Sequence, residues 1–196
     1  MDERLYSLFL AELAAGRKAE AKVAVERFVS SFGDIEEKQL WTQHYLPSLP
    51  PGAIVRHELF ESLIFPVLLS GYEKREPFSM LWLAKLAQNL YRAKRLHAQL
   101  SWVTDEELLK EAYALAPHSE EIQVALLEAL IAKFCYLGHE WPSGILYAPH
   151  GVWQTQYWNL MEEVRLARTV DTTQKYVDNL TEFEQKVTLD RMRRIG

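Results

Sequence analysis

The chain has 196 residues, 48% of them hydrophobic and 25% charged, and this composition predicts one soluble globular domain over residues 1–196 with a sizeable core. The formal net charge of −5 argues against general binding to nucleic-acid backbones, which requires a basic surface. The single cysteine, Cys135, excludes a disulfide framework and fits a reducing, cytoplasmic location.

The first part of the chain predicts three helices. Apolar residues at helical spacing predict helices over 2–15 and 18–32, and the break at Gly16 is short enough to make them antiparallel neighbours. Asp34 with Glu37 has the spacing of a capping box, which predicts the start of a third helix. The proline-rich stretch that follows offers a subdivision into an N-terminal three-helix piece, 1–46, and a main helical body, 53–196.

Two helical segments are predicted between residues 53 and 100. The apolar pattern over 53–70 predicts a largely buried helix, kinked or broken at Pro66 because proline lacks a backbone N–H. Residues 78–100 have the longest helical pattern in the chain, with one apolar stripe at spacings of three and four. His97 lies on that stripe, where we expect a hydrogen-bonded core histidine.

The stretch 104–137 predicts the helix pair around which the chain is organised. Thr104 and Glu107 have the spacing of a capping box, Pro117 ends the first helix, and Ser119 is expected to cap the second. The second helix is apolar on most sides, which is typical of a buried central helix.

The last part of the chain predicts a loop and two helices. Glycines and prolines within 138–151 exclude regular structure, so we expect Gly138 to end the preceding helix. Helices are expected over 152–168 and from about 172 to 192, the second one capped by Asp171. Because no strand alternation is visible, the predicted fold class is all-α, with antiparallel helical hairpins stacked in one compact domain.

Two short segments resemble tetratricopeptide-type helical-hairpin repeats. Residues 111–117 (EAYALAP) are similar to the end of the second helix of such a repeat, and residues 13–21 to the turn between its helices. The tryptophan, glycine and tyrosine of the repeat's first helix are not at their places, and no period near 34 residues recurs. The resemblance covers about a quarter of the chain and implies a right-handed array of hairpins that binds another protein.

Catalytic or metal-binding chemistry would have to gather scattered side chains, because the chain has no glycine-rich phosphate loop, serine nucleophile elbow or paired-cysteine motif. A histidine and a carboxylate four residues apart share one helix face and can bind a metal ion together. No third ligand follows from the sequence, so surface or ion-paired residues are the simpler interpretation. The candidate ligands are His57, Glu61, His139 and Glu140.

Cys135 and His139 are also four residues apart, which is a spacing that could activate a thiolate. Since Gly138 is expected to end the helix between them, we expect Cys135 to be a small core residue instead.

The most distinctive segment, 138–158, is rich in aromatic residues and has one formal charge, at Glu140. Tryptophan and tyrosine offer large, rigid contact areas and are typical interface anchors. The segment is therefore either a lid over the core or a surface for a partner, and its prolines and glycines exclude a membrane span. The candidate partner-binding residues are Trp141, Tyr147, His150, Trp153, Tyr157 and Trp158.

The leading hypothesis is a cytoplasmic, non-enzymatic helical protein-binding module without a cofactor. An adaptor fits it, as does an inhibitor or immunity-type protein that blocks a basic partner by charge complementarity. A homodimer with the aromatic segment at its two-fold interface is a further hypothesis. The alternative is a small all-α enzyme or metal- or ligand-binding protein, whose pocket would gather His57, Glu61, His139, Glu140 and His150.

Overall fold

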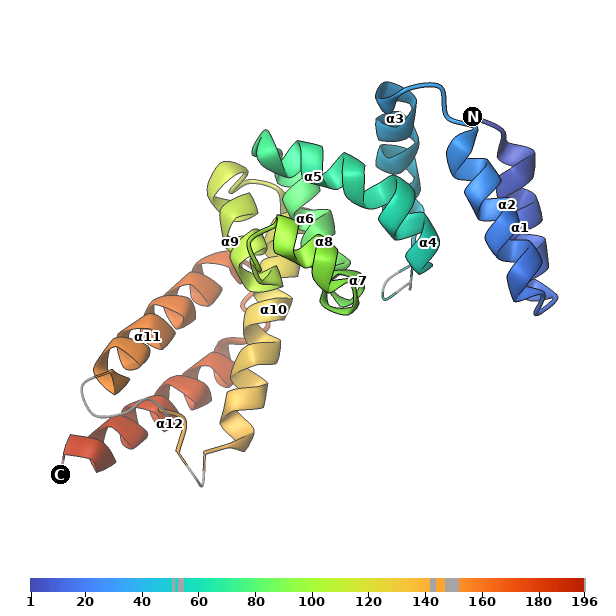
Figure 1. Ribbon diagram of the computed structural model, residues 1–196. Coiled ribbons are helices and arrows are strands. Elements are labelled where there is room, and N and C mark those ends of the chain that lie inside the picture. The colour runs from blue at the N-terminus through green and yellow to red at the C-terminus, as the bar shows by residue number, and fades with distance from the viewer. Residues whose placement is uncertain (51, 53–54, 142–143, 147–151, 196) are drawn as a thin grey trace. The chain divides into compact units, whose positions relative to one another are not determined.

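The computed structural model describes residues 1–50, 52, 55–141, 144–146 and 152–195, and over these ranges the chain forms helices and no strands (Figure 1). The predicted all-α fold class is therefore confirmed. Contacts divide the chain into two compact units, Met1–Ala112 and Tyr113–Gly196. The single domain, the subdivision after residue 46 and the tetratricopeptide-like arrangement stay predictions.

The first unit begins with a hairpin of α1 (Glu3–Ala14) and α2 (Lys18–Ser30), as predicted. Asp2 caps α1, because its carboxylate accepts a hydrogen bond from the Arg4 N–H at 3.0 Å. Gly16 reverses the chain with a φ of +74°, a left-handed conformation that glycine adopts without steric cost.

The helix α3 (Ile35–Tyr45) starts at the predicted cap. The Asp34 carboxylate accepts from the Glu37 N–H at 2.8 Å, and the Glu37 carboxylate accepts from the Gly33 N–H at 2.8 Å. Glu37 therefore reaches one residue further back than the capping box requires. A 3₁₀ turn, Leu46–Ser48, follows α3.

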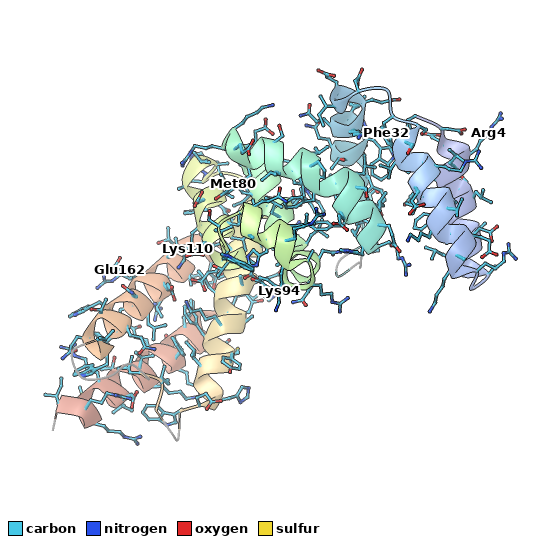
Figure 2. All side chains as sticks on the ribbon, viewed as in Figure 1. Arg4, Phe32, Met80, Lys94, Lys110 and Glu162 are labelled. Atoms are coloured by element: carbon cyan, nitrogen blue, oxygen red, sulfur yellow. The ribbon has the colours of Figure 1, made fainter. Side chains whose placement is uncertain are left out.

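Aromatic rings form the core of the helices α1 to α3. Trp41 stacks on Tyr45 with ring centroids 4.4 Å apart, and Phe28 lies edge-on to Trp41 at 5.4 Å. Phe32, labelled in Figure 2, also meets Trp41 edge-on, at 6.1 Å. Burial raises the pKa of the Tyr45 hydroxyl, and a hydrogen bond with Tyr6 raises it further.

The predicted helix over 53–70 is three consecutive helical segments in the structure. They are α4 (His57–Leu59), a π-helical turn (Phe60–Ile64) and α5 (Phe65–Glu73). The Phe65 N–H donates to the Phe60 carbonyl, five residues back, which is the π-helical pattern. Pro66 has no N–H to continue the α-helical ladder, so the irregularity falls where the sequence predicts it. The helix α2 packs against α4, and α3 packs against α5.

The helices α5 and α6 (Pro77–Lys85) approach each other closely at Gly71. A Cβ at this position would lie 1.9 Å from the Ser79 Oγ and 2.6 Å from a Glu76 carboxylate oxygen. Only glycine therefore allows this packing.

The prediction of one long helix over 78–100 is wrong. The segment forms α6, α7 (Ala87–Arg92) and α8 (Lys94–Gln99), with breaks at Leu86 and Ala93. Leu86, Leu90 and Leu100 of the predicted apolar stripe are buried, and so is Leu96 of α8. His97 is a hydrogen-bonded core histidine as expected, with its Nε2 2.8 Å from the Val103 carbonyl oxygen.

The predicted capping box before α9 (Asp105–Leu115) is confirmed. The Thr104 hydroxyl accepts from the Glu107 N–H at 3.2 Å, and the Glu107 carboxylate accepts from the Thr104 N–H at 2.8 Å. The hydrogen bonds from the Thr104 backbone and side chain hold the pKa of Glu107 below its usual value.

The second unit is a bundle of three long helices, α10 (Glu120–His139), α11 (Trp153–Val170) and α12 (Val177–Ile195), which pack pairwise. Phe134 of α10 stacks on Phe183 of α12 with ring centroids 4.5 Å apart. The Asp171 carboxylate is buried and accepts from the N–H groups of Lys175 and Tyr176, which both precede α12. The prediction that Asp171 caps the last helix is therefore wrong, because α12 begins at Val177, five residues later than predicted.

The prediction that α10 is buried on most sides is wrong. Its buried residues form one stripe, whereas Val124 is 48% and Tyr136 is 68% exposed. Ser119 has the extended backbone of an N-cap, but its side chain makes no capping hydrogen bond to the described first turn. Among the described helices, α10 alone is long and apolar enough to cross a membrane, which is a weak indication because core helices pass the same test.

Candidate functional site

The aromatic residues of the predicted partner-binding segment divide between the core and the surface of the second unit. Trp153 and Tyr157 are 5% and 6% exposed and belong to the core. Trp158 is 51% exposed, and Trp141 is half-buried. Tyr147 and His150 lie outside the described residues. The prediction of a partner surface therefore concerns Trp141 and Trp158 in the part of the chain that the structure describes.

Two arginines of α12 lie over these aromatic rings. The Arg191 guanidinium carbon is 4.5 Å from the centroid of the Tyr157 ring and 5.3 Å from that of Trp158. Tyr157 and Trp158 meet edge-on at 5.0 Å, so the three groups order one another. A cation over an aromatic face within 6 Å contributes about 0.5–1 kcal/mol at an exposed site.

Arg193 makes the corresponding contact on the other flank of α12. Its guanidinium carbon is 4.6 Å from the centroid of the Trp141 ring. Residues 191 and 193 are about 200° apart around a helix, so the two arginines lie on opposite sides of α12. The pairs Arg191–Trp158 and Arg193–Trp141 therefore flank its outer face.

A buried carboxylate holds the chain that follows Trp141. Asp190 of α12 is 4% exposed, and its Oδ2 accepts from the N–H groups of Ile145 and Leu146, both at 2.8 Å. The Arg194 Nε lies 3.7 Å from the same oxygen. Because Ile145 and Leu146 are fully buried, this anchor ties the described residues 144–146 to α12.

Exposed apolar residues lie between the two arginines. Leu189, Met192 and Ile195 are 49%, 62% and 64% exposed on the last two turns of α12. We call the whole set the Trp/Arg surface; it consists of Trp141, Trp158, Leu189, Arg191, Met192, Arg193 and Ile195. An exposed apolar patch of this kind is typical of an interaction site.

The charge of the Trp/Arg surface differs from that of the chain. Among the described residues, no carboxylate forms an ion pair with Arg191 or Arg193. Glu140 directly precedes Trp141 but pairs with neither arginine. The residues of α11 from 153 to 161 are all uncharged. This end of the second unit is therefore locally cationic in a chain of net charge −5.

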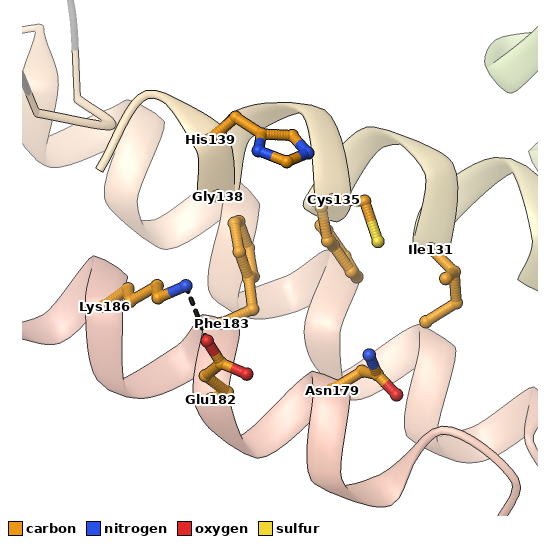
Figure 3. Close-up of a pocket in the computed structure, with 9 residues that line it drawn as sticks. Ile131, Cys135, Gly138, His139, Asn179, Glu182, Phe183 and Lys186 are labelled. Atoms are coloured by element: carbon orange, nitrogen blue, oxygen red, sulfur yellow. Dashed lines mark ion pairs between the residues drawn. The ribbon is translucent and has the colours of Figure 1, made fainter. Parts of the chain in front are cut away.

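A pocket of about 200 Å³ lies between α10 and α12 (Figure 3). Its walls include the Cys135 thiol, the His139 ring and the Asn179 amide. Lys186 forms an ion pair with Glu182 at 2.6 Å on the α12 side of the pocket. The stacked rings of Phe134 and Phe183 also line it, so the pocket is polar on one part and apolar on the other.

Two predictions about this pocket region are wrong. Gly138 does not end the helix, because α10 continues to His139, and Cys135 is exposed rather than part of the core. The physical reason is that α10 buries the stripe through Leu130 and Phe134, and this places the next residue, Cys135, on the outer side.

The predicted metal ligands are placed separately in the two units. His57 and Glu61 of the first unit form an ion pair, with Nε2 and carboxylate oxygen 3.1 Å apart, and Arg95 also pairs with Glu61. His139 and Glu140 of the second unit lie at the end of α10. Over the described ranges, no group of three or more His, Cys, Asp or Glu side chains could hold a metal ion. For His57 and Glu61, the structure therefore supports the simpler interpretation, that they are ion-paired residues.

The basic cluster of Arg191, Arg193 and Arg194 is visible in the sequence, but charge at a helix C-terminus is its simpler interpretation, and none of the three was a predicted site residue. Arg191 and Arg193 fit the ordinary preference for cations in the last turn of a helix, so their sequence position alone does not mark them. Their aromatic partners lie on other segments, and only the bundle brings them together. Comparisons of the chain with known protein families, with curated proteins and with solved structures find no match.

Proposed function

We propose that the protein is a non-enzymatic helical protein-binding module and that the Trp/Arg surface contacts its partner. The observation that carries the proposal is Arg191, which lies over Trp158 while half of that indole stays open to solvent. Tryptophan, tyrosine and arginine are the residues most enriched among those that dominate binding energy in protein interfaces. The exposed Leu189, Met192 and Ile195 beside them supply apolar area.

The order of the Trp/Arg surface supports this role. A side chain that loses rotamer freedom on binding costs about 0.5–1.5 kcal/mol. Arg191 already lies against two rings, and Arg193 against one, so part of this cost is absent when a partner arrives. The Asp190 anchor likewise holds Ile145 and Leu146, and the Gly144 N–H donates to the Trp141 carbonyl at 3.2 Å.

The proposal places the protein in the cytoplasm as an adaptor or as an inhibitor that blocks its partner. The exposed thiol of Cys135 suits a reducing compartment, because an open cysteine in an oxidising compartment invites intermolecular disulfides. Nothing in this role calls for a cofactor.

The experiment is quantitative capture of native lysate proteins on the full chain, with Trp158→Ala as the test variant. Tyr136→Ala is the matched control, because Tyr136 is a 68% exposed aromatic residue on the same unit that lies outside the Trp/Arg surface. Both variants are first checked for wild-type helicity by circular dichroism. We expect one or a few proteins to be retained, at least tenfold less by Trp158→Ala than by Tyr136→Ala. Equal retention by the two variants would contradict the proposal.

A further inference from the structure

We propose that the partner of the Trp/Arg surface is a protein segment with two carboxylates flanking an apolar residue. The inference rests on the proposed function and adds the chemistry of the partner. It also reverses the charge that the whole sequence suggests, because a chain of net charge −5 favours a basic partner.

The first step concerns the hydrogen-bonding edges of the two guanidinium groups. The guanidinium carbons of Arg191 and Arg193 lie over aromatic rings, and no described carboxylate accepts from their N–H groups. A guanidinium presents its donors in a planar fork that matches a carboxylate in a bidentate pair. Both guanidinium groups therefore keep N–H donors available for an incoming carboxylate.

The second step concerns what surrounds the two forks. The one acidic side chain on the last three turns of α12 is Asp190, which is buried and already accepts two backbone hydrogen bonds. The facing residues 153–161 of α11 carry no charge. Within the described part of the second unit, no carboxylate thus neutralises the attraction of Arg191 and Arg193 for an incoming carboxylate.

The third step concerns spacing. The two arginines lie on opposite flanks of α12, and a helix with its side chains is on the order of 10 Å across. An extended chain covers that width with three or four residues. Because alternate side chains of an extended chain share one face, a segment with carboxylates four residues apart also places its middle residue over the outer face of α12. Met192, 62% exposed, lies in the middle of that face and favours an apolar contact.

Other polyanions fit the Trp/Arg surface less well. Proteins that bind the nucleic-acid backbone typically neutralise 6–10 phosphates, whereas this surface offers two unpaired arginines. An anionic membrane likewise recognises clusters of four to eight basic residues. Both extended surfaces would also be repelled by the net charge of −5. Two discrete carboxylates match two discrete guanidinium groups.

The experiment measures binding of a fluorescein-labelled synthetic peptide to the full chain by anisotropy. The peptide has two glutamates four residues apart, with phenylalanine midway between them and alanine at the two remaining positions, and the comparison peptide has lysines in place of the glutamates. We expect saturable binding of the glutamate peptide only, weakened at least tenfold by Arg191→Gln and by Arg193→Gln. Arg27→Gln is the matched control, an exposed arginine of the first unit, and should leave the affinity unchanged.

Several results would overturn the inference. They are equal binding of the two peptides, no binding of either, or an Arg191-dependent preference for a single-stranded oligonucleotide or a phosphatidylserine vesicle. A concentration-dependent dimer that Arg191→Gln abolishes would also overturn it, because the occupant would then be a second copy of the chain. If Trp158-dependent capture persists without peptide binding, only the partner chemistry is wrong. If that capture fails as well, the proposed function is wrong with it.

Discussion

Replacement of Asp190 by alanine should remove the anchor that ties residues 144–146 to α12. The Asp190 Oδ2 accepts two backbone hydrogen bonds at 2.8 Å, from Ile145 and Leu146, in a place where both residues are fully buried. Alanine leaves both N–H groups without an acceptor and leaves the Arg194 guanidinium without its carboxylate. The perturbation therefore acts through unsatisfied buried donors rather than through lost apolar contact.

The magnitude follows from the number of donors. A hydrogen bond to a charged group contributes about 1.5–3 kcal/mol, and a buried donor left unpaired costs about 1–3 kcal/mol. With two donors affected and partial relaxation of the chain around them, we expect Asp190→Ala to lower the free energy of unfolding by about 3–5 kcal/mol. Asp190→Asn keeps an oxygen acceptor in place and should cost about 1–2 kcal/mol.

Urea denaturation of the full chain, followed by circular dichroism, measures the change in the free energy of unfolding. Hydrogen–deuterium exchange of a peptide covering 144–146 reports on the anchor itself, and its amides should exchange faster in Asp190→Ala than in Asp190→Asn. A stability loss below 1 kcal/mol for Asp190→Ala, with exchange unchanged at 144–146, would refute the reasoning, because the two hydrogen bonds would then contribute nothing.

Three further predictions concern helix packing, capping and thiol exposure. Gly71→Ala should lower the free energy of unfolding by about 1–3 kcal/mol in thermal or urea unfolding, because the new Cβ meets α6. Gly138→Ala has open space around it inside α10 and should raise the free energy of unfolding by about 0.5–1 kcal/mol. A loss of stability in both variants would contradict this. Thr104→Ala should lower the free energy of unfolding by about 1 kcal/mol. Because the folded pKa of Glu107 is lowered, the contribution of Glu107 is present above about pH 4.5 and is lost as the pH falls through the folded pKa. The difference in unfolding free energy between wild type and Thr104→Ala should therefore narrow in acid, and a difference independent of pH would contradict this. Cys135 should react fully with an aromatic disulfide reagent in native buffer, and reaction only after denaturation would show that the thiol is buried.

The features that the sequence predicted well depend on residues within one turn of each other. The capping box of Thr104 and Glu107 is complete in the structure, and Asp34 starts α3 as expected. The irregularity at Pro66 likewise follows from one residue that lacks a donor. Such signals need no knowledge of which elements meet, so the sequence alone suffices for them.

The predictions that failed depend on contacts between distant segments. Nothing at Leu86 or Ala93 marks a helix break, because these breaks serve the packing of the surrounding core. Gly138 carries a helix penalty of about 1 kcal/mol, which the packing of α10 outweighs. The exposure of Cys135 could not be predicted either, since a helix that is apolar on most sides does not reveal which stripe its neighbours cover.

The candidate site was predicted only in part, for the same reason. Trp141 and Trp158 were identified by composition, but Trp153 and Tyr157 proved to be core residues with an identical appearance in the sequence. Arg191 lies over rings on α11, and no local pattern in the sequence joins them.

The π-helical turn Phe60–Ile64 has a consequence for how this region tolerates changes in length. Each residue rotates the following side chains by about 100° around a helix, and the turn holds one residue more than an α-helical turn would. Removal of a single residue there would restore a regular helix but would swing the whole of α5 out of phase with α3 and α6, the helices against which it packs. The backbone would become more ideal while the core lost its register, so insertions and deletions should be far more damaging at this turn than point substitutions on its outer side.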